Sequence, residues 1–231
     1  MGVCKVIGFV GIDKYEIVLY LSQIIKNLGR SVLISDSSVY GALDDSISYV
    51  KEKSSNEIIN YMGINYINTI REEKVSYNCQ EVLNLEENKE KYDFILIDFG
   101  FDVSADIYNL CDSAFIVTDM QKHNIRRAGS LADKINIPYS IIIKDMIKCK
   151  ISSDYLAKSI QRSHPAQMVY TVYKDTLDEE YKLKCQYNTR IGFKKLSKDF
   201  RNMLIAIVKS CNGDIEEKTI TKALRMAESG R

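Results

Sequence analysis

The sequence predicts a doubly wound α/β domain, in which a mostly parallel sheet carries helices on both faces. Two observations lead to this prediction. Short, continuously apolar segments rich in β-branched residues recur along the chain, and segments with helical spacing of apolar residues lie between most of them. Strands that alternate with helices in this way usually pair in parallel and are joined by right-handed crossovers.

The first strand and helix are the clearest pair of predicted elements. Residues 5–10 form a short β-branched run, and residues 14–28 then repeat apolar side chains at helical spacing. Gly29 follows this helix at a position where left-handed caps are common. Residues 31–35 predict the second strand, which ends just before Asp36.

The next part of the chain is polar and its pattern is weaker. We expect helices over 47–53 and 56–62, followed by a strand over 64–70 whose alternation is weak. Residues 81–92 predict a further helix. The segment "DFILID", residues 93–98, is the most convincing buried strand in the chain.

The second half of the chain continues the alternation of strands and helices. Residues 113–119 predict a strand and residues 123–135 a helix, and Pro138 separates that helix from a strand over 139–145. The remaining predicted elements are a helix over 152–163, a strand over 168–173 and a long helix over 194–211.

No linker rich in Pro, Gly or Ser interrupts this pattern, so we expect one domain over residues 1–212. Residues 213–231 predict a C-terminal helical tail, which is either solvated or packed on a partner rather than anchored in a membrane. The 231 residues are 45% hydrophobic, which is enough for a large core without cross-links.

Charge and cysteine content exclude several classes of protein. Lys and Arg number 32 and Asp and Glu 31, so no global field directs the chain to nucleic acid or to an anionic surface, and only a local patch could do so. The six cysteines form no C-x-x-C pair and only two histidines are present, which argues against a zinc site or a disulfide framework. We expect a cytoplasmic protein without a signal peptide or membrane span, and peripheral contact with the inner face of a membrane is left open.

The segment "GFVGIDKYE", residues 8–16, has the spacing of a phosphate-binding loop, G-x-x-x-x-G-K-[ST]. Gly8 and Lys14 hold the first glycine and the lysine, whereas Asp13 replaces the second glycine and Tyr15 the hydroxyl residue. Gly11 is expected to help shape the strand-to-helix turn. Phosphates bound here would meet the N-terminus of the helix, with Lys14 as a point charge beside them.

Acidic residues follow two other predicted strands at the same edge of the sheet. Asp36 closes the second strand, and Asp98 with Gly100 closes the "FILID" strand. Ligands of doubly wound sheets bind at this edge, where Asp36 and Asp98 could approach Mg²⁺ directly or through water. The alternatives are structural: Lys14 as an exposed lysine of the first helical turn, and the two acids as polar strand ends.

In order and spacing these segments resemble the ParA/MinD branch of deviant Walker-type P-loop ATPases. The stretch "VIGFVGIDKYEIVLYLSQIIKNLGRSVLISDSS" is similar to that family's first strand, loop, helix and second strand. The segment "KYDFILIDFG" resembles its Walker B strand, and "CDSAFIVTD" and "IPYSIIIKD" its next two strands. The resemblance covers residues 3–210 and implies an ATP- and Mg²⁺-binding fold.

The departures from the family pattern lie at positions to which the resemblance assigns nucleotide binding, metal binding or hydrolysis. Phe9 stands at the second, signature lysine, and Tyr15 and Glu16 stand at the two hydroxyl residues, the first of which ligates magnesium in the family. Ser38 replaces the second acid, which the family associates with hydrolysis. Lys144–Asp145 stands where the family often carries an asparagine for adenine.

The segment "QKHNIRRAG", residues 121–129, gathers basic side chains near a predicted helix start. Lys122, Arg126 and Arg127 could contact DNA phosphates or an acidic partner. The alternative is a solvated helix face.

Two functions remain from different classes. The favoured one is a non-hydrolytic or weakly nucleotide-binding scaffold or positioning factor, similar to the TadZ/CpaE group, for a bacterial secretion, pilus or other cell-envelope assembly. It implies protein partners and a homodimer, with ATP and Mg²⁺ as cofactors only if the loop still binds them. The alternative is an active ATPase switch with an atypical loop that cycles on DNA or membrane.

Overall fold

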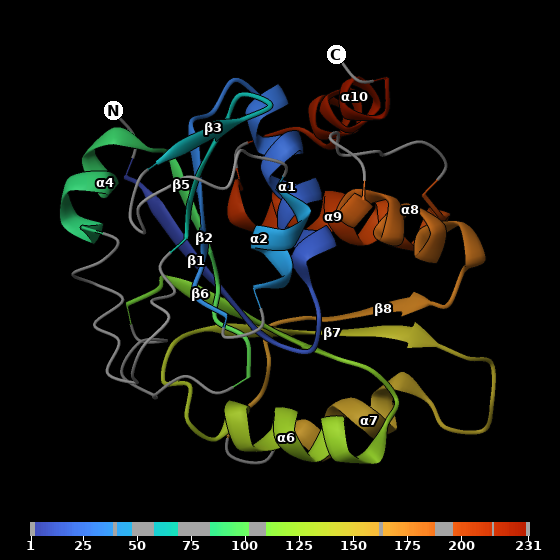
Figure 1. Ribbon diagram of the computed structural model, residues 1–231. Helices are drawn as coiled ribbons and strands as arrows, with labels where there is room; N and C mark the ends of the chain where they lie inside the picture. Colours follow the sequence, from blue (N-terminus) through green and yellow to red (C-terminus); the bar gives the residue numbers. More distant parts are fainter. Residues whose placement is uncertain are drawn as a thin grey trace.

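One eight-stranded sheet runs through the part of the chain that the structure describes (Figure 1). The structure is a computed structural model that describes residues 3–38, 41–47, 58–68, 84–101, 110–161, 164–187, 196–213 and 215–229. The strands are β1 Lys5–Gly11, β2 Val32–Asp36, β3 Ile59–Tyr61, β4 Ile64–Asn68, β5 Phe94–Asp98, β6 Ser113–Thr118, β7 Tyr139–Met146 and β8 Val169–Tyr173.

The strand order is β3-β4-β2-β5-β1-β6-β7-β8, and every neighbouring pair is parallel except the antiparallel pair β3–β4. The described helices are α1 Tyr15–Asn27, α2 Ala42–Ser46, α4 Leu85–Lys91, α6 Lys122–Ala132, α7 Ser153–Ile160, α8 Thr176–Tyr187, α9 Lys198–Cys211 and α10 Glu217–Glu228. The predicted doubly wound, mostly parallel α/β fold is confirmed.

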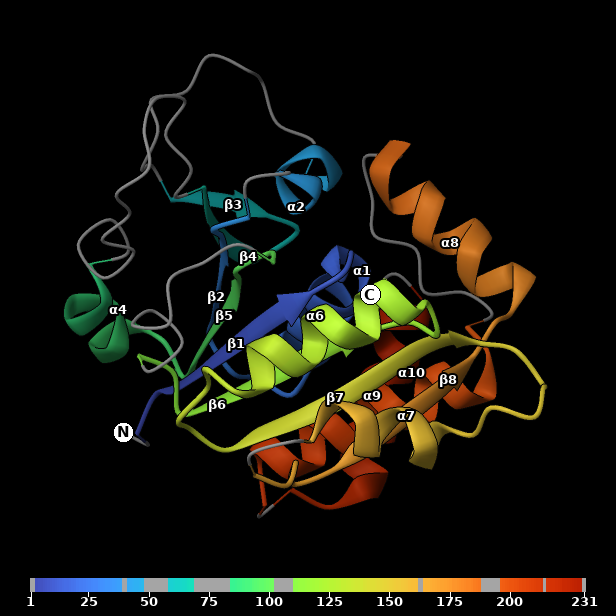
Figure 2. The ribbon, with the colours of Figure 1, turned by 90° about the horizontal axis from the view of Figure 1, so that it is seen from below.

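Two hydrophobic clusters lie on the two faces of the sheet. Figure 2 shows the helices that cover these faces. On one face, α1 packs with α9 and α10, and the side chains of α1 are buried from Tyr15 to Ile25. On the other face, α6 packs over β6 and β1 and lies side by side with α7. Within the described residues, no helix is long and apolar enough to cross a membrane.

The region between β2 and β4 corrects one sequence prediction. A helix over 56–62 was expected, but Ile59–Tyr61 forms β3, which pairs antiparallel with β4. Met62 and Gly63 both adopt positive φ, 53° and 77°, and make the two-residue turn of this hairpin. The turn-forming dipeptide therefore overrides the helical spacing of the apolar residues. Most of the helix predicted over 47–53 lies outside the described residues.

Two helices were not anticipated from the sequence, namely α2 and α8. Helix α8 buries only Asp178 and Cys185, while Leu177 and Leu183 are exposed. Its apolar residues do not form one stripe, so the sequence lacks the periodicity that indicates a surface helix.

The C-terminal helix α10 packs on α1 and α9. Ile220 and Leu224 are fully buried in the same hydrophobic cluster as the core of α1. The side-chain amide of Asn27, the last residue of α1, donates to the carbonyl of Ala223 at 3.1 Å. The apolar face of α10 is therefore part of the core.

The turn between β1 and α1 depends on a glycine. Gly11 has a φ of 118°, and a Cβ atom there would lie 2.0 Å from the carbonyl oxygen of Val117 in β6. The amide of the next residue, Ile12, donates to that same carbonyl at 3.0 Å. A side chain at Gly11 would thus break the contact that directs the chain from β1 towards α1.

A comparison of two glycines tests this close approach. We expect Gly29→Ala to lower the free energy of unfolding by about 1–2 kcal/mol, because Gly29 has positive φ but open space around it. Gly11→Ala should cost at least about 2 kcal/mol more, because its methyl group meets the backbone of β6. Urea unfolding of both variants measures the difference, and equal losses would contradict the role given to Val117.

The place of α10 in the core can be tested in the same way. Leu224→Ala should lower the free energy of unfolding by about 2–5 kcal/mol, because it removes fully buried methyl groups. Met226→Ala is the matched control on the exposed side of α10, with an expected change within about 0.5 kcal/mol. Similar small effects for both variants would mean that α10 packs only loosely on α1.

Candidate functional site

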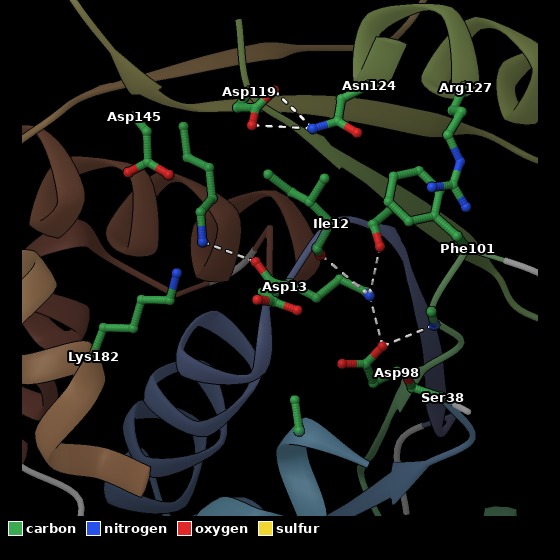
Figure 3. Close-up of a pocket in the computed structure, with 15 residues that line it drawn as sticks. Ile12, Asp13, Ser38, Asp98, Phe101, Asp119, Asn124, Arg127, Asp145 and Lys182 are labelled. Atoms are coloured by element: carbon green, nitrogen blue, oxygen red, sulfur yellow. Dashed lines mark hydrogen bonds and ion pairs between the residues drawn. The ribbon is translucent and has the colours of Figure 1, made fainter. Parts of the chain in front are cut away.

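A cavity of about 390 Å³ lies at the carboxyl ends of the central strands, beside the first turn of α1 (Figure 3). The predicted residues Gly11, Asp13, Lys14, Asp98 and Gly100 line it. Gly8, Tyr15 and Asp36, which were also predicted for this site, are not among the lining residues. The sheet therefore brings the glycine loop and the end of β5 together, as the sequence predicts for this edge.

Lys14 makes a buried ion pair inside the protein. Its ammonium group lies 2.7 Å from Oδ1 of Asp98, and both side chains are almost fully buried. The ammonium also donates to the carbonyls of Gly11 and Ile12, at 3.3 and 3.4 Å. The alternative of an exposed lysine in the first helical turn is therefore wrong. The charge of Lys14 is already neutralised by a residue of β5.

Asp36 lies beside this pair, because β2 and β5 place Asp36 in register with Asp98. Its carboxylate accepts the backbone amides of Ser38 and Asp44, both at 2.9 Å. Complete burial and the nearby Asp98 raise the pKa of Asp36 to about 7. Asp36 thus anchors the start of the loop after β2 and the first turn of α2.

A second buried ion pair joins α1 to β7. The ammonium of Lys144 pairs with Glu16, and it also donates to the carbonyl of Asp13 at 2.8 Å. Burial alone would lower the pKa of Lys144, but the Glu16 carboxylate holds that pKa above its ordinary value. Oε2 of Glu16 is buried and makes no hydrogen bond within the described part of the chain.

The side chain of Tyr15 does not line the cavity. It is buried, and its hydroxyl donates to the carbonyl of Lys182 in α8 at 3.0 Å. Burial, together with the neighbouring Glu16, raises the pKa of this phenol. At the position where the resemblance implies a magnesium-binding hydroxyl, this chain therefore has a contact between two helices.

The donors present do not fit a magnesium ion as the family resemblance implies it. One oxygen of Asp98 is held by an ammonium group, and Asp36 is occupied by two backbone amides. Over the described ranges, no group of three His, Cys, Asp or Glu side chains is placed to hold a metal. A cation here would meet an Asp98 carboxylate whose charge is already paired with the Lys14 ammonium.

The signature-lysine position of the family is part of the core in this chain. Phe9 is fully buried in β1 and stacks on Phe115 of β6, with ring centroids 5.3 Å apart. Its side chain carries no charge and does not reach the cavity. Ser38, at the second acidic position, does line the cavity.

The opposite wall of the cavity comes from β6 and α6 (Figure 3). The Asn124 amide donates to both carboxylate oxygens of Asp119, at 3.0 and 3.1 Å. The guanidinium of Arg127 lies 3.7 Å from the ring centroid of Phe101. Sequence reasoning missed Asp119 and Asn124, although Asp119 is the last residue of a predicted strand, as Asp98 is.

The predicted basic cluster divides between the cavity and the surface. Lys122, Arg126 and Arg127 are all exposed on α6, but only Arg127 lines the cavity. Lys182 of α8 also lines it, on the same side of the cavity as Asp145 in Figure 3, and was not anticipated because α8 itself was not.

No protein-family model matches the sequence, and no curated protein matches it. Solved structures match over nearly the whole chain. A ParA family ATPase from Chlorobium tepidum is 20% identical with a TM-score of 0.60, over 97% of this chain and 98% of that one. The MinC:MinD cell division protein complex of Aquifex aeolicus is 14% identical with a TM-score of 0.61, and the match covers 98% of this chain and 96% of that one.

A third structure, a Cyanothece McdA variant in complex with ATP, is 10% identical with a TM-score of 0.62, over 94% of this chain and 99% of that one. Such identities carry information on the fold alone. The chain therefore has the fold of the ParA/MinD ATPases, as the order of its sequence segments predicts.

Proposed function

We propose that this chain is a ParA/MinD-fold protein whose nucleotide site is closed by its own ion pairs, and that it acts as a non-hydrolytic scaffold or positioning factor. The single observation that carries the proposal is the buried pair between Glu16 and Lys144. By the family resemblance, Glu16 replaces a hydroxyl residue of the phosphate loop and Lys144 replaces an asparagine near adenine. Two departures that are far apart in the sequence are thus partners in one interaction.

The charges around the loop also disfavour a polyphosphate. The carboxylate of Glu16 is buried in the first turn of α1, where the resemblance implies phosphate oxygens. Asp13 adds a second acid at a position where the family has glycine for close approach of the backbone. A phosphate that recruits Lys14 must compete with Asp98 at 2.7 Å. Breaking a buried pair of this kind costs about 3–5 kcal/mol.

A scaffold acts through protein surfaces, so the proposal implies protein partners and a homodimer that forms without nucleotide. MinD, which has this fold, was solved in complex with MinC. The resemblance to the TadZ/CpaE group implies a cytoplasmic protein of a bacterial cell. It also implies that the assembly is secretion, pilus or other cell-envelope machinery.

An active ATPase switch with an atypical loop is the second candidate. Gly11 and Lys14 are retained, and the cavity beside them offers about 390 Å³. This candidate requires nucleotide to displace Asp98 from Lys14 and a metal to bind without a hydroxyl ligand from Tyr15.

Titration with fluorescent ATP and ADP, with and without Mg²⁺, separates the two candidates. We expect no saturable binding at high micromolar nucleotide, because the cations of the loop are held by carboxylates. The double variant Glu16→Thr/Lys144→Asn, which restores the family's residue types, should bind more tightly than the wild type. Tight, Mg²⁺-dependent binding by the wild type that is lost in Lys14→Ala, with phosphate release, would establish the ATPase switch instead.

A double-mutant cycle tests whether the interaction between Glu16 and Lys144 stabilises the folded protein. Glu16→Gln and Lys144→Met should each lower the free energy of unfolding by about 3 kcal/mol, because each leaves an unpaired buried group. The double variant should lose clearly less than the sum of the two.

The exposed pair Lys184–Glu180 on α8 is the matched control for this cycle. Because both of its side chains are about half exposed, we expect no resolvable coupling there. Additive effects of Glu16→Gln and Lys144→Met in urea unfolding would remove the support that this pair gives to the proposed function.

A further inference from the structure

The loop between β7 and α7 presents apolar and basic side chains alternately to solvent. Ile147 and Ile151 are 56% and 46% exposed, and the lysines at 148 and 150 between them are also exposed. Tyr155, in the first turn of α7, is 64% exposed. The yellow segment in Figures 1 and 2 shows that this loop extends away from the end of the sheet.

Several contacts fix the shape of this loop. The amide of Ile147 donates to Sδ of Met120 at 3.3 Å, which ties the start of the loop to the segment before α6. At the other end, the Ser152 hydroxyl caps α7 by accepting the amide of Tyr155 at 3.3 Å. The thiol of Cys149 donates to the carbonyl of Ile151 at 3.8 Å within the loop. The two isoleucines are therefore exposed in an organised loop.

The segments hydrogen-bonded to the start of this loop are followed or preceded by basic residues. Lys122, two residues after Met120, is the first residue of α6, and Arg126 is one turn further along the same helix. Lys174 follows β8, and its amide donates to the carbonyl of Met146 at 2.8 Å, next to Ile147. Asp154 on α7 is an exposed acid, and Asp119 and Asp175, which adjoin Met120 and Lys174, are half-buried, so only the fully exposed charges of these segments are mainly basic.

We propose that this loop, Ile147 to Ser152 with Tyr155, docks on an anionic membrane surface. The isoleucine side chains and the tyrosine ring would enter the headgroup region, where amphipathic side chains are favoured. The ammonium groups of Lys148 and Lys150 would meet lipid phosphates, while their methylene stems lie along the apolar boundary. This goes beyond a scaffold role because it names the surface on which the protein would be held.

The pattern of residues favours lipid over other anionic partners. A protein interface has an apolar centre from which charges are depleted, but here Lys148 and Lys150 lie between the two exposed isoleucines in the sequence. Nucleic acid is bound mainly through phosphate contacts, which gives no use to two exposed isoleucines. A membrane surface accepts both kinds of side chain at the same depth.

The C-terminal helix cannot take this role in the conformation described. Ile220, Ala223 and Leu224 of α10 are buried against α1 and α9. Membrane insertion of that apolar face would require α10 to leave the core, whereas the loop after β7 is already exposed.

Co-sedimentation of the full chain with lipid vesicles tests the proposal. We expect the chain to bind vesicles of equal parts phosphatidylglycerol and phosphatidylcholine, and to bind much less to phosphatidylcholine alone or at high salt. Ile147→Asn/Ile151→Asn and Lys148→Glu/Lys150→Glu should each lower the partition coefficient by about tenfold or more.

Two matched double variants serve as controls. Lys218→Glu/Lys222→Glu on α10 makes the same change in net charge at exposed sites, and Leu183→Asn/Tyr187→Asn on α8 removes two exposed apolar side chains. Both should keep the wild-type partition coefficient. The proposal is overturned if the anionic vesicles are not bound, or if the controls lose as much binding as the loop variants. It is also overturned if the loop variants lose binding to duplex DNA but keep binding to vesicles.

Discussion

The Lys14–Asp98 ion pair is the interaction on which the site is built, because it joins the start of α1 to the end of β5 in the middle of the sheet. Burying two charges is favourable only when each is fully paired, so the pair defines the position of the loop before α1. That position in turn requires Gly11, whose backbone passes too close to β6 for any side chain. The pair between Glu16 and Lys144 then holds the next turn of α1 against β7.

These pairs leave the cavity nearly balanced in charge without any ligand. Four basic residues and four aspartates are among those that line it: Lys14, Arg127, Lys144 and Lys182, and Asp13, Asp98, Asp119 and Asp145. In a phosphate-binding loop, the phosphates of the ligand compensate the excess positive charge. Here the carboxylates supply the negative charge from within the chain. The chain keeps the geometry of the fold, but its cavity offers little net electrostatic attraction to a nucleotide. This charge balance is the physical basis of the proposed function.

The fold was largely predictable because long apolar strands carry their signal locally, as "FILID" does for β5. Lys14 and Asp98 were also expected at one edge, since parallel strands share that edge. The Glu16–Lys144 pair was not predictable, because its partners are 128 residues apart and meet only once β7 has its place in the sheet. Strand β3 was mispredicted as part of a helix, because the two-residue turn at Met62 and Gly63 gives a weaker sequence signal than the helical spacing of the apolar residues. Helix α8 lacked an apolar stripe.

A loop that is neutralised by its own side chains behaves differently from one that is ordered by a ligand. A ligand can shift a conformational equilibrium only by the difference in its affinity for the two states. If the Glu16–Lys144 pair already stabilises the described conformation of the loop, nucleotide binding can change that conformation only by first overcoming the pair. The surfaces of such a protein are presented permanently, and its location follows from the concentration of partners and surfaces. The exposed loop after β7 suits that mode of action, because its isoleucines and lysines are displayed whether or not the cavity is occupied.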